Sequence, residues 1–454
     1  INYSLSYLNN IYLTPNYDNG SHNWWDNGTI GNYWFDYIGY DYDYDNIGDP
    51  PYLLNGTANS KDNFPIYDGS STPLSINSLS KGIHAHNWTW AVEKPWCRGS
   101  GTPSDPYIID DLMYEGEYLY TALEIENNRD CVIINKSLFS KAKIGLKLYN
   151  CSNIEIKNNS FQDLSGFDGG ATMAIQLENV SNIVVFGNLI ANIAGKSGSN
   201  GVEGSPGTKG GNGADAKAIF CQNSSNLIFE KNNLSYIQGG SGGDGGKGSN
   251  NILAPGGEGG DGGASGSSMG LEVLKSSLIT IQDVSIQNLT AGDGGNGGAG
   301  GDCLMSNMAV GDGGNGGNGI SGGSAFGISI VQTNLITVSE ILIKDIQGGE
   351  GGNGGRGGHG DVYGEDFEHA GHGGQSGAGG NSSGLYLFDC DTMCFNISEI
   401  KNIFGGNGGD GGDGGHAAES STTYGGNGGD GQYGNRGGGA FGVYGTNIHH
   451  VFKQ

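Results

Sequence analysis

Basic residues, prolines and long hydrophobic runs are scarce in this sequence. Of its 454 residues, 21 are Lys or Arg and 47 are Asp or Glu, for a formal net charge of −26. Without a basic stripe to neutralise phosphates, nucleic acids and anionic membranes are poor partners. Since no run of about 18 apolar residues occurs, no segment is expected to insert into a membrane. No signal peptide is visible at Ile1, so we interpret the chain as a mature product or as a piece of a longer protein.

Zinc-type cysteine pairs are absent as well. No two of the seven cysteines form a Cys-x-x-Cys motif, which argues against a zinc ribbon. Several occupy strand positions expected to point inward, which favours buried thiols over a disulfide framework. An odd count leaves at least one thiol unpaired within a single chain. The cysteines are Cys97, Cys131, Cys151, Cys221, Cys303, Cys390 and Cys394.

Glycine, in contrast, is abundant. The chain has 91 glycines, while 35% of its residues are hydrophobic. A compact globule of this composition would bury too little apolar surface, so we expect a thin, elongated core. Composition divides the chain into an aromatic and acidic module (residues 1–70), a connector with an N-terminal cap (71–105), and a region of short strands and glycine tracts (106–454).

A strand pattern repeats along the third region. Segments such as Asn182-Ile-Val-Val and Asn226-Leu-Ile-Phe begin with a polar residue and continue with apolar residues in period two. One short strand precedes each such segment and another follows it, as in Ile286-Gln-Asn-Leu. Three strands per repeat predict an all-β fold, a right-handed parallel β-helix whose coils stack because none can bury its inner face alone. The recurring Asn at one corner is expected to form a side-chain ladder.

Glycine-rich insertions follow the third strand of successive coils. We expect them to leave the β-helix at one corner and on one side. They lie at about 195–216, 238–268, 292–326, 348–383 and 405–440.

The insertions keep a Gly-Gly-x period, as in GGEGGNGGRGG from Gly348. This period lacks the imino acids of collagen but fits the three-fold polyproline-II geometry adopted by glycine, so we predict stacked polyglycine-II hairpins. Such a bundle resembles those of snow-flea antifreeze proteins and of certain phage tail-tip adhesins. Disordered linkers are one alternative. Calcium-binding β-rolls are another, although Gly246 and Gly412 stand where a β-roll needs an apolar residue.

A metal loop is predicted in the N-terminal module. Carboxylates stand at loop positions 1, 3, 5 and 9, a main-chain carbonyl is available at position 7, and a further carboxylate follows in sequence. This oxygen-rich spacing suits Ca²⁺ in an EF-hand-like loop, although Tyr52 replaces the usual Glu at position 12. An acidic solvated turn is the alternative. The proposed ligands are Asp41, Asp43, Asp45, Ile47, Asp49 and Asp62.

Several segments resemble NosD-like β-helix proteins of archaeal surfaces. Residues 24–37, 47–52 and 61–65 are similar to the closing module of that family, and residues 99–109 (GSGTPSDPYII) to its opening coil. The resemblance implies that the chain starts inside one β-helix unit and stops inside another. Because uncapped coils expose strand edges, head-to-tail or tandem assembly with copies of itself is expected.

Asn-x-Ser/Thr motifs are dense, which favours a secreted, glycosylated protein at the cell surface. The acceptors are Asn2, Asn19, Asn27, Asn55, Asn87, Asn135, Asn150, Asn158, Asn179, Asn223, Asn233, Asn288, Asn381 and Asn396.

Catalytic motifs are not evident. Glycosidic cleavage needs converging carboxylates, whereas coil charges such as Glu155, Glu178 and Glu230 are isolated in sequence. The acidic and histidine-rich tip at residues 361–372 is interpreted as a solvated tip rather than a metal site. We therefore expect a protein that is not an enzyme, but a structural subunit of an extracellular filament, sheath or surface layer. The alternatives are an adhesin that binds glycans or cell surfaces through its hairpin tips, and a polysaccharide lyase or hydrolase.

Overall fold

The structure is a computed structural model, which divides the chain into two compact units. One unit comprises residues 1–72 and 115–117, and the other comprises residues 73–114 and 118–454. The residues that it describes are 10–11, 25–34, 47–48, 51–54, 60–66, 74–77, 87–92, 94, 96–116, 118–167, 169–252, 254–304, 312–360, 369–416 and 434–453.

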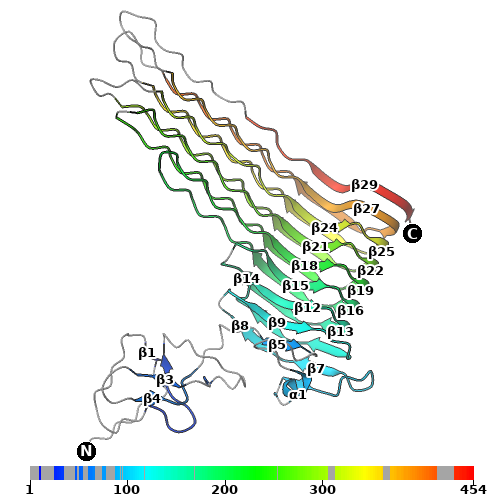
Figure 1. The fold of residues 1–454 in the computed structure, drawn as a ribbon. Coiled ribbons are helices and arrows are strands. Elements are labelled where there is room, and N and C mark those ends of the chain that lie inside the picture. Colours follow the sequence, from blue (N-terminus) through cyan, green and yellow to red (C-terminus); the bar gives the residue numbers. More distant parts are fainter. Residues whose placement is uncertain are drawn as a thin grey trace, which may run out of the picture. The chain divides into compact units, whose positions relative to one another are not determined.

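The larger unit is a parallel β-helix, as the repeat pattern predicts (Figure 1). Each complete coil has three strands, and each strand pairs in parallel with the corresponding strand of the next coil. The first strands are β9 (Thr121–Glu126), β12 (Ile144–Tyr149), β15 (Thr172–Glu178), β18 (Ala216–Gln222), β21 (Ser268–Leu274), β24 (Ala325–Val331), and the opening halves of β27 (Ser382–Asn396) and β29 (Ala440–Lys453).

The second strands continue the same sheet around a corner. They are β7 (Tyr107–Asp110), β10 (Val132–Asn135), β13 (Ser152–Lys157), β16 (Ser181–Phe186), β19 (Ser225–Glu230), β22 (Ser277–Gln282), β25 (Asn334–Ser339) and the remainder of β27 and β29. The third strands form a separate sheet of β8 (Met113–Glu115), β11 (Leu138–Ser140), β14 (Ser160–Ser165), β17 (Leu189–Ala194), β20 (Asn233–Gln238), β23 (Ser285–Thr290), β26 (Leu342–Gln347) and β28 (Glu399–Phe404).

Inward-facing side chains fill the β-helix in rows. Ile183, Leu227 and Ile279 lie at matching register positions in successive coils and are buried. Phe139 and Phe161 stack at 4.9 Å between ring centroids. Each coil contributes only a few apolar residues, so the core is thin and continuous, as the composition predicts.

The N-terminal end of the β-helix carries a cap. β5 (Leu74–Asn77) pairs in parallel with β9, and β6 (Cys97–Arg98) pairs antiparallel with β7. The short helix α1 (Trp88–Ala91) places Trp88 against the Tyr107 ring, at 4.3 Å between centroids, and the Trp88 indole donates a hydrogen bond to Asn128.

Glycine hairpins leave the β-helix after the third strands β17, β20, β23, β26 and β28, before the next first strand and on one side (Figure 1). We number them hairpins 1 to 5; they span residues 195–215, 239–267, 291–324, 348–381 and 405–439. Their backbone hydrogen bonds recur every three residues. Gly239 N donates to Thr290 O in the next layer, and Gly243 N donates to Gly211 O in the previous layer. This network agrees with the predicted stack of three-fold glycine rods.

Close packing explains why two of every three residues are glycine. A Cβ atom on Gly298 would lie 2.1 Å from Gly246 O, and one on Gly317 would lie 2.0 Å from Gly260 O. The third residue of each triplet points outward. Its side chain commonly caps the next layer, as where Asn296 Oδ1 accepts the amide of Asn353 at 2.8 Å.

The smaller unit contains short strands. β1 (Asn10–Ile11) pairs in parallel with β2 (Tyr33–Trp34), and β3 (Tyr52–Leu53) pairs antiparallel with β4 (Lys61–Asp62). Within the described residues, no helix is both long and apolar enough to cross a bilayer.

Candidate functional site

The predicted calcium loop falls mostly outside the described residues. Asp41, Asp43, Asp45 and Asp49 belong to segments that the structure does not describe. Ile47 forms an isolated antiparallel bridge with Ile66. The loop therefore stays a prediction.

The remaining predicted ligand, Asp62, is buried in the smaller unit. Its carboxylate accepts the amides of Asn32 at 2.7 Å and Phe64 at 3.1 Å. A Cβ on Gly31 would lie 1.9 Å from Asp62 Oδ1, so glycine is required beside the carboxylate. These contacts give Asp62 a structural role in joining the segment after Ile30 to β4.

The predicted glycosylation acceptors divide by location. Asn2, Asn19 and Asn55 lie outside the described residues, whereas Asn27 and Asn87 are exposed and use their side chains to cap local backbone amides. Asn135, Asn150 and Asn288 are half-buried, and the exposed acceptors of the β-helix are Asn158, Asn179, Asn223, Asn233, Asn381 and Asn396.

Several of these motifs also have a structural explanation. Asn150, Asn158, Asn179 and Asn223 have positive φ angles between +50° and +54°, a conformation that Asn tolerates better than most residues. Each occupies a corner of the β-helix, and the next residue is buried. The Ser or Thr position then opens the following strand, as Ser181 opens β16. The corner geometry therefore gives the Asn of these motifs a structural reason apart from glycosylation.

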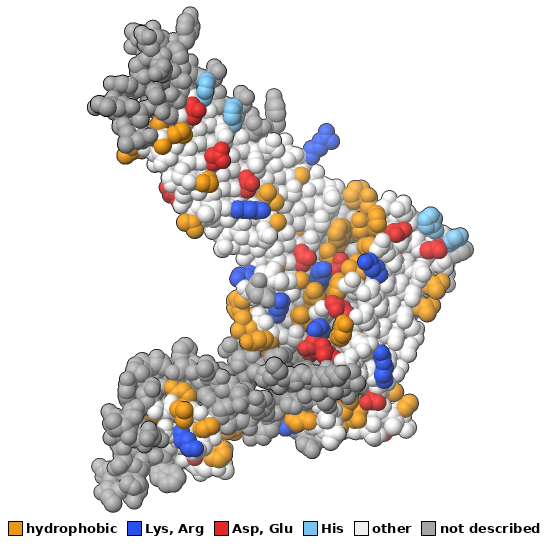
Figure 2. All heavy atoms as spheres, viewed as in Figure 1, with side chains coloured by type: hydrophobic (Ala, Val, Ile, Leu, Met, Phe, Trp, Pro, Cys, Tyr) orange, Lys and Arg blue, Asp and Glu red, His pale blue; other side chains and the backbone are white. Residues whose placement is uncertain are grey.

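The most varied chemistry lies on the outer face of the first strands, which we call the front face. Figure 2 shows apolar, acidic and basic side chains gathered there over β12 to β29, beside the base of the hairpins. One outward row contains Met173, Lys217, Met269 and Phe326 in successive coils. A second row contains Glu124, Lys147, Gln176, Phe220, Glu272, Ser329, Tyr386 and Tyr444.

Two carboxylates flank one ammonium group at the centre of this face. Lys217 Nζ lies 2.7 Å from Glu272 Oε2 and 3.9 Å from Asp215 Oδ2. The Lys217 and Glu272 side chains are 12% and 10% exposed, whereas that of Asp215 is 39% exposed. Asp215 Oδ1 also accepts the Ser267 amide at 2.8 Å, which fixes it at the end of hairpin 1.

A second ion pair lies further toward the N-terminal end. Lys147 Nζ is 2.5 Å from Glu124 Oε1. Burial lowers the pKa of Lys147, but the hydrogen bond and charge of Glu124, with the charges of Glu126 and Glu178, outweigh it and raise that pKa above its ordinary value.

An unpaired acceptor lies between the two ion pairs. Gln176 is 9% exposed, and its Nε2 donates to Glu178 at 2.7 Å, while its Oε1 has no hydrogen-bond partner. A buried amide oxygen without a donor costs free energy, about 1–3 kcal/mol, unless water or a ligand supplies the donor. This oxygen marks the front face as a place where a hydroxyl-bearing ligand would gain a hydrogen bond.

Aromatic rings continue the front face toward the C-terminal coils. Phe326 and Tyr386 lie 4.9 Å apart, and Tyr386 stacks on Tyr444 at 5.4 Å between centroids. Phe441 lies 5.1 Å from Tyr444. Polar groups and ring faces along one straight surface are suited to sugar rings, which present hydroxyls at their edges and apolar faces above and below.

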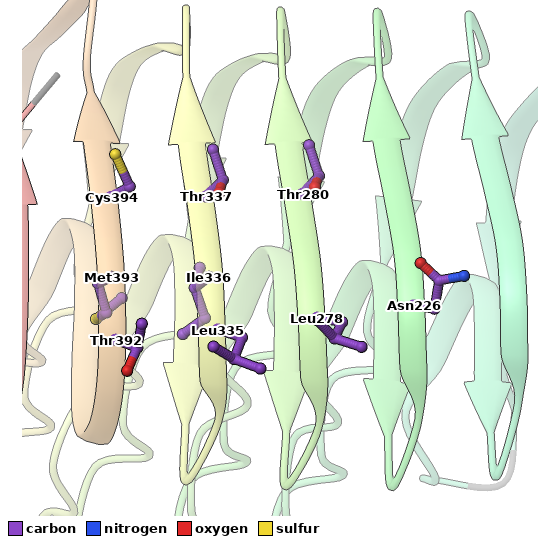
Figure 3. A pocket seen from close by; sticks show the side chains of 9 residues that line it. All are labelled: Asn226, Leu278, Thr280, Leu335, Ile336, Thr337, Thr392, Met393 and Cys394. Atoms are coloured by element: carbon purple, nitrogen blue, oxygen red, sulfur yellow. The ribbon is translucent and has the colours of Figure 1, made fainter.

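A shallow hollow of about 300 Å³ lies on the outer face of the second strands (Figure 3). The predicted Asn ladder runs there through Asn153, Asn182 and Asn226, with amide-to-oxygen distances of 3.1 and 2.8 Å. Leu278 and Leu335 then take the same corner at φ angles of +55° and +53°, and both are exposed. The hollow is apolar and holds no charged group, so it offers no acid–base chemistry.

Cysteine chemistry and metal binding find little support in the described residues. Burial raises the pKa of Cys97 to about 12 and the pKa values of Cys151 and Cys221 to about 11, which keeps these thiols protonated near neutral pH. In the part of the chain that the structure describes, no group of three His, Cys, Asp or Glu side chains is placed to hold a metal ion. The tip residues 361–368 lie outside that part; His369 and His372 are described at its border.

No known protein family and no curated protein sequence matches this chain. Among solved structures, the catalytic domain of a GH87 α-1,3-glucanase in complex with nigerose is similar at 12% identity and a TM-score of 0.18, over 52% of this chain and 50% of that one. The chain thus spans about half the length of the glucanase that it matches.

Two other solved structures are similar. One is the family 28 exopolygalacturonase of Yersinia enterocolitica, at 9% identity and a TM-score of 0.21, over 86% of this chain and 79% of that one. The other is a springtail antifreeze protein from Granisotoma rainieri, a bundle of nine polyproline type II helices, at 18% identity and a TM-score of 0.09, over 56% of this chain and 94% of that one. At these identities and TM-scores the similarities describe a type of fold and not an activity.

The expectation that the protein is not an enzyme is corrected by these results. Two glycoside hydrolases are among the solved structures similar to the chain, and the exclusion of enzymes is withdrawn. Its premise also fails, because the charges are not isolated in space: Asp215, Lys217 and Glu272 converge on the front face. The sequence concealed this cluster, since Lys217 and Glu272 are 55 residues apart with hairpin 2 between them.

Proposed function

We propose that the protein binds an extended polysaccharide along the front face and hydrolyses it with Asp215 and Glu272. The observation that carries the proposal is the pair of carboxylates on either side of Lys217 Nζ. Because the two oxygens lie 2.7 and 3.9 Å from one nitrogen, they are at most 6.6 Å apart, a limit compatible with the spacing of about 5–5.5 Å between acid and nucleophile in retaining glycosidases. Gln176 and the row from Phe326 to Tyr444 extend the surface on both sides.

An uncharged glycan fits this surface better than a polyuronate. Five acidic side chains accompany two lysines on the front face, and each lysine is already paired with a carboxylate. An anionic chain would meet this excess of negative charge, which costs binding free energy. Neutral α- or β-glucans are therefore the first substrates to test.

Reducing-end release from a panel of neutral and anionic polysaccharides tests the proposal. Glu272→Gln and Asp215→Asn preserve shape and should each reduce hydrolysis by about 10²-fold or more, since each removes one of two required carboxyl groups. Glu155→Gln, which alters an exposed carboxylate on β13, is the matched control and should leave the rate unchanged.

Binding is measured separately with the Glu272→Gln variant and a glycan array. Retained binding with lost hydrolysis supports both parts of the proposal. Binding without hydrolysis by the unaltered protein would remove the catalytic part, and absence of both on every glycan would overturn the whole. A polyuronate bound more tightly than neutral glucans would overturn the charge argument.

A structural role in a cell-surface filament, sheath or layer is the second candidate. Its support is the outer edge of β29, where Phe441, Val443 and Val451 are 39%, 54% and 55% exposed. Apolar strand edges of this kind pair readily with another β-sheet, so a further β-helix coil would stack on β29. Electron microscopy of native material distinguishes the candidates, because ordered polymers support assembly and dispersed particles do not. The adhesin alternative predicts glycan binding that survives loss of the front face.

An extracellular, glycosylated and calcium-stabilised protein is the setting we propose for either role. Support comes from the density of Asn-x-Ser/Thr motifs and from the loop beginning at Asp41. Mass spectrometry before and after glycosidase treatment tests glycosylation. A higher melting temperature in Ca²⁺ than in chelator, lost in Asp43→Asn, tests the loop.

A further inference from the structure

The stack of glycine hairpins has two different ends. The triplets are written Gly-Gly-x. In every inner layer, a Cβ added to the second residue of a triplet on the outgoing strand would point toward the preceding layer. A Cβ on Gly240, Gly243 or Gly246 would lie 2.0 to 2.1 Å from a backbone oxygen of hairpin 1. Glycine is therefore obligatory at these positions wherever a previous layer exists.

Hairpin 1 is the first layer and has no preceding layer, and side chains stand at most of these positions. Its residues at the equivalent positions are Lys196, Ser199 and Val202, whose backbone oxygens lie against the glycines of hairpin 2. On its returning strand, Thr208, Gly211 and Ala214 take the equivalent positions, so five of the six positions on the two strands carry a side chain. With side chains on its outer side, hairpin 1 closes the stack, because no further glycine strand can approach.

Hairpin 5, at the other end, keeps glycine where its own fold does not require it. On returning strands, the first residue of each triplet points its Cβ position at the next layer, as where a Cβ on Gly379 would lie 1.9 Å from Gly406 O. At the equivalent Gly437 and Gly434 the nearest atom would lie 3.2 Å away. In the described residues these nearest atoms belong to hairpin 5 itself and no further layer meets the two Cβ positions, yet no side chain stands there.

The same end presents a row of unused backbone donors. In hairpin 4, Gly351, Gly354 and Gly357 donate to carbonyls of hairpin 5 at 2.8 Å. Within the described part of the chain, the equivalent amides of hairpin 5 have no acceptor. They are the amides of Gly405, Gly408, Gly411 and Gly414.

Side-chain caps are also in place for a further layer. One outward column runs through Asn200, Asp244, Asn296, Asn353 and Asp410, and each side-chain oxygen caps the amide of the next member. Asp410 is the last member in the described residues. Its carboxylate stands where the side-chain oxygens of the preceding members accept an amide from the next layer.

We propose that this edge of hairpin 5 is a docking site for an extended Gly-Gly-x strand that forms a further layer of the stack. Such a strand would accept hydrogen bonds from these four amides through the carbonyls of its x residues, and Asp410 would cap one of its x amides. This is the polyglycine counterpart of adding a strand to an open sheet edge.

The site selects for glycine by shape. In each described layer, a Cβ at the second position of an outgoing triplet would meet a backbone oxygen of the preceding layer, as with Gly355 and Gly298 O at 2.0 Å. An incoming strand with alanine at that position would therefore be held away from the donor row. The edge therefore binds a strand only when glycines recur in every triplet and stand at the second position of the triplet.

A peptide with the sequence of residues 348–359 (GGEGGNGGRGGH), labelled with a fluorophore, is the probe. Fluorescence anisotropy should show saturable binding to the intact chain. A matched peptide with alanine at the positions of Gly349, Gly352, Gly355 and Gly358 should bind about tenfold more weakly or not at all, because its methyl groups meet the backbone of hairpin 5.

The protein side is tested with Gly437→Val, whose Cβ lies 3.2 Å from Gly406 O, so that the hairpin shifts only slightly while a branched side chain covers the edge. It should lose peptide binding, whereas Arg436→Ala, an outward substitution in the same strand, should retain it. Equal binding of the two peptides, equal binding by the two variants, or no binding up to the solubility limit of the peptide would each overturn the proposal. The test is independent of polysaccharide hydrolysis.

Discussion

The β-helix and the glycine hairpins are one continuous stack of layers held together in two different ways. In the β-helix, side chains such as Phe229 and Ile281 point inward and are fully buried, so burial of apolar surface stabilises each coil. In the hairpins the interior contains backbone alone, and hydrogen bonds such as Gly317 N to Gly298 O at 2.8 Å join the layers.

The two regions therefore tolerate opposite substitutions. Removing side-chain volume damages the β-helix, because it leaves a cavity. Adding even a methyl group damages the hairpins, because backbone oxygens already occupy the space. The outward residues of both regions share one device, a ladder in which a side-chain amide or carboxylate caps the next layer.

Truncation of the core should have the largest effect. Phe229→Ala removes a fully buried ring from β19 and should lower the free energy of unfolding by about 3–5 kcal/mol. Chemical denaturation followed by far-ultraviolet circular dichroism measures this. Phe186→Ala, at an outward and half-buried position on β16, is the control and should cost clearly less.

A methyl group inside the glycine stack should come next. Gly298→Ala places a Cβ 2.1 Å from Gly246 O, and such overpacking typically costs about 1–3 kcal/mol. The loss should appear as faster proteolysis within the hairpins while the β-helix stays protected. Gly437→Ala, whose Cβ would lie 3.2 Å from its nearest atom, should be damaged clearly less, and equal damage by both variants would contradict the steric explanation.

The two side-chain ladders should differ in importance. Asn188 is buried in the β-helix and bonds Asn159 on one side and Asn232 on the other at about 3.0 Å. Asn188→Ala leaves buried polar groups unpaired and should cost about 1–3 kcal/mol, whereas Asn296→Ala on the exposed hairpin ladder should cost less, because water replaces the lost cap. A larger loss for Asn296→Ala would reverse this comparison.

Thiol reactivity separates the interior of the β-helix from its surface. Because burial raises the pKa values of Cys97, Cys151 and Cys221, these thiols should react with a thiol reagent at neutral pH only as fast as the fold opens. Cys131 and Cys394 are half-buried and should react first. Mass spectrometry at increasing reaction times gives the order.

The smallest effect should come from an exposed contact in the last coil. The hydrogen bond from His450, at 2.8 Å, holds the pKa of Asp391 below its ordinary value of 3.8. A depressed folded-state pKa contributes stability above the unfolded pKa and loses it as the pH falls through the folded pKa, so any contribution should fade below about pH 4. His450→Ala should return the pKa of Asp391 toward 3.8 in an NMR titration.

Much of the fold could be predicted from the sequence because its signals are local. Period-two strands such as Asn226-Leu-Ile-Phe, the Gly-Gly-x phase and the position of each insertion after a third strand all lie within one coil. Stacking then follows from the unburied inner face of each coil. The Asn ladder was anticipated on the same basis, and Leu278 and Leu335 interrupt it.

The front face could not be predicted in this way. Lys217 and Glu272 are adjacent in space because β18 and β21 pair, yet hairpin 2 lies between them in sequence. Their isolation in the sequence led to the exclusion of catalysis. Likewise, the dense Asn-x-Ser motifs indicated glycosylation, while the structure shows that a left-handed corner gives the Asn of several of them a structural reason as well.

The sequence by itself determined which residues face inward, where the hairpins leave the coils and which triplet positions must be glycine, since each depends on periodicity within one short segment. The tertiary structure alone decided which charges meet on the front face and which end of the glycine stack is closed. Those properties depend on contacts between layers. The sequence separation of two residues in neighbouring layers varies with the length of the hairpin between them, so it does not show which side chains become neighbours.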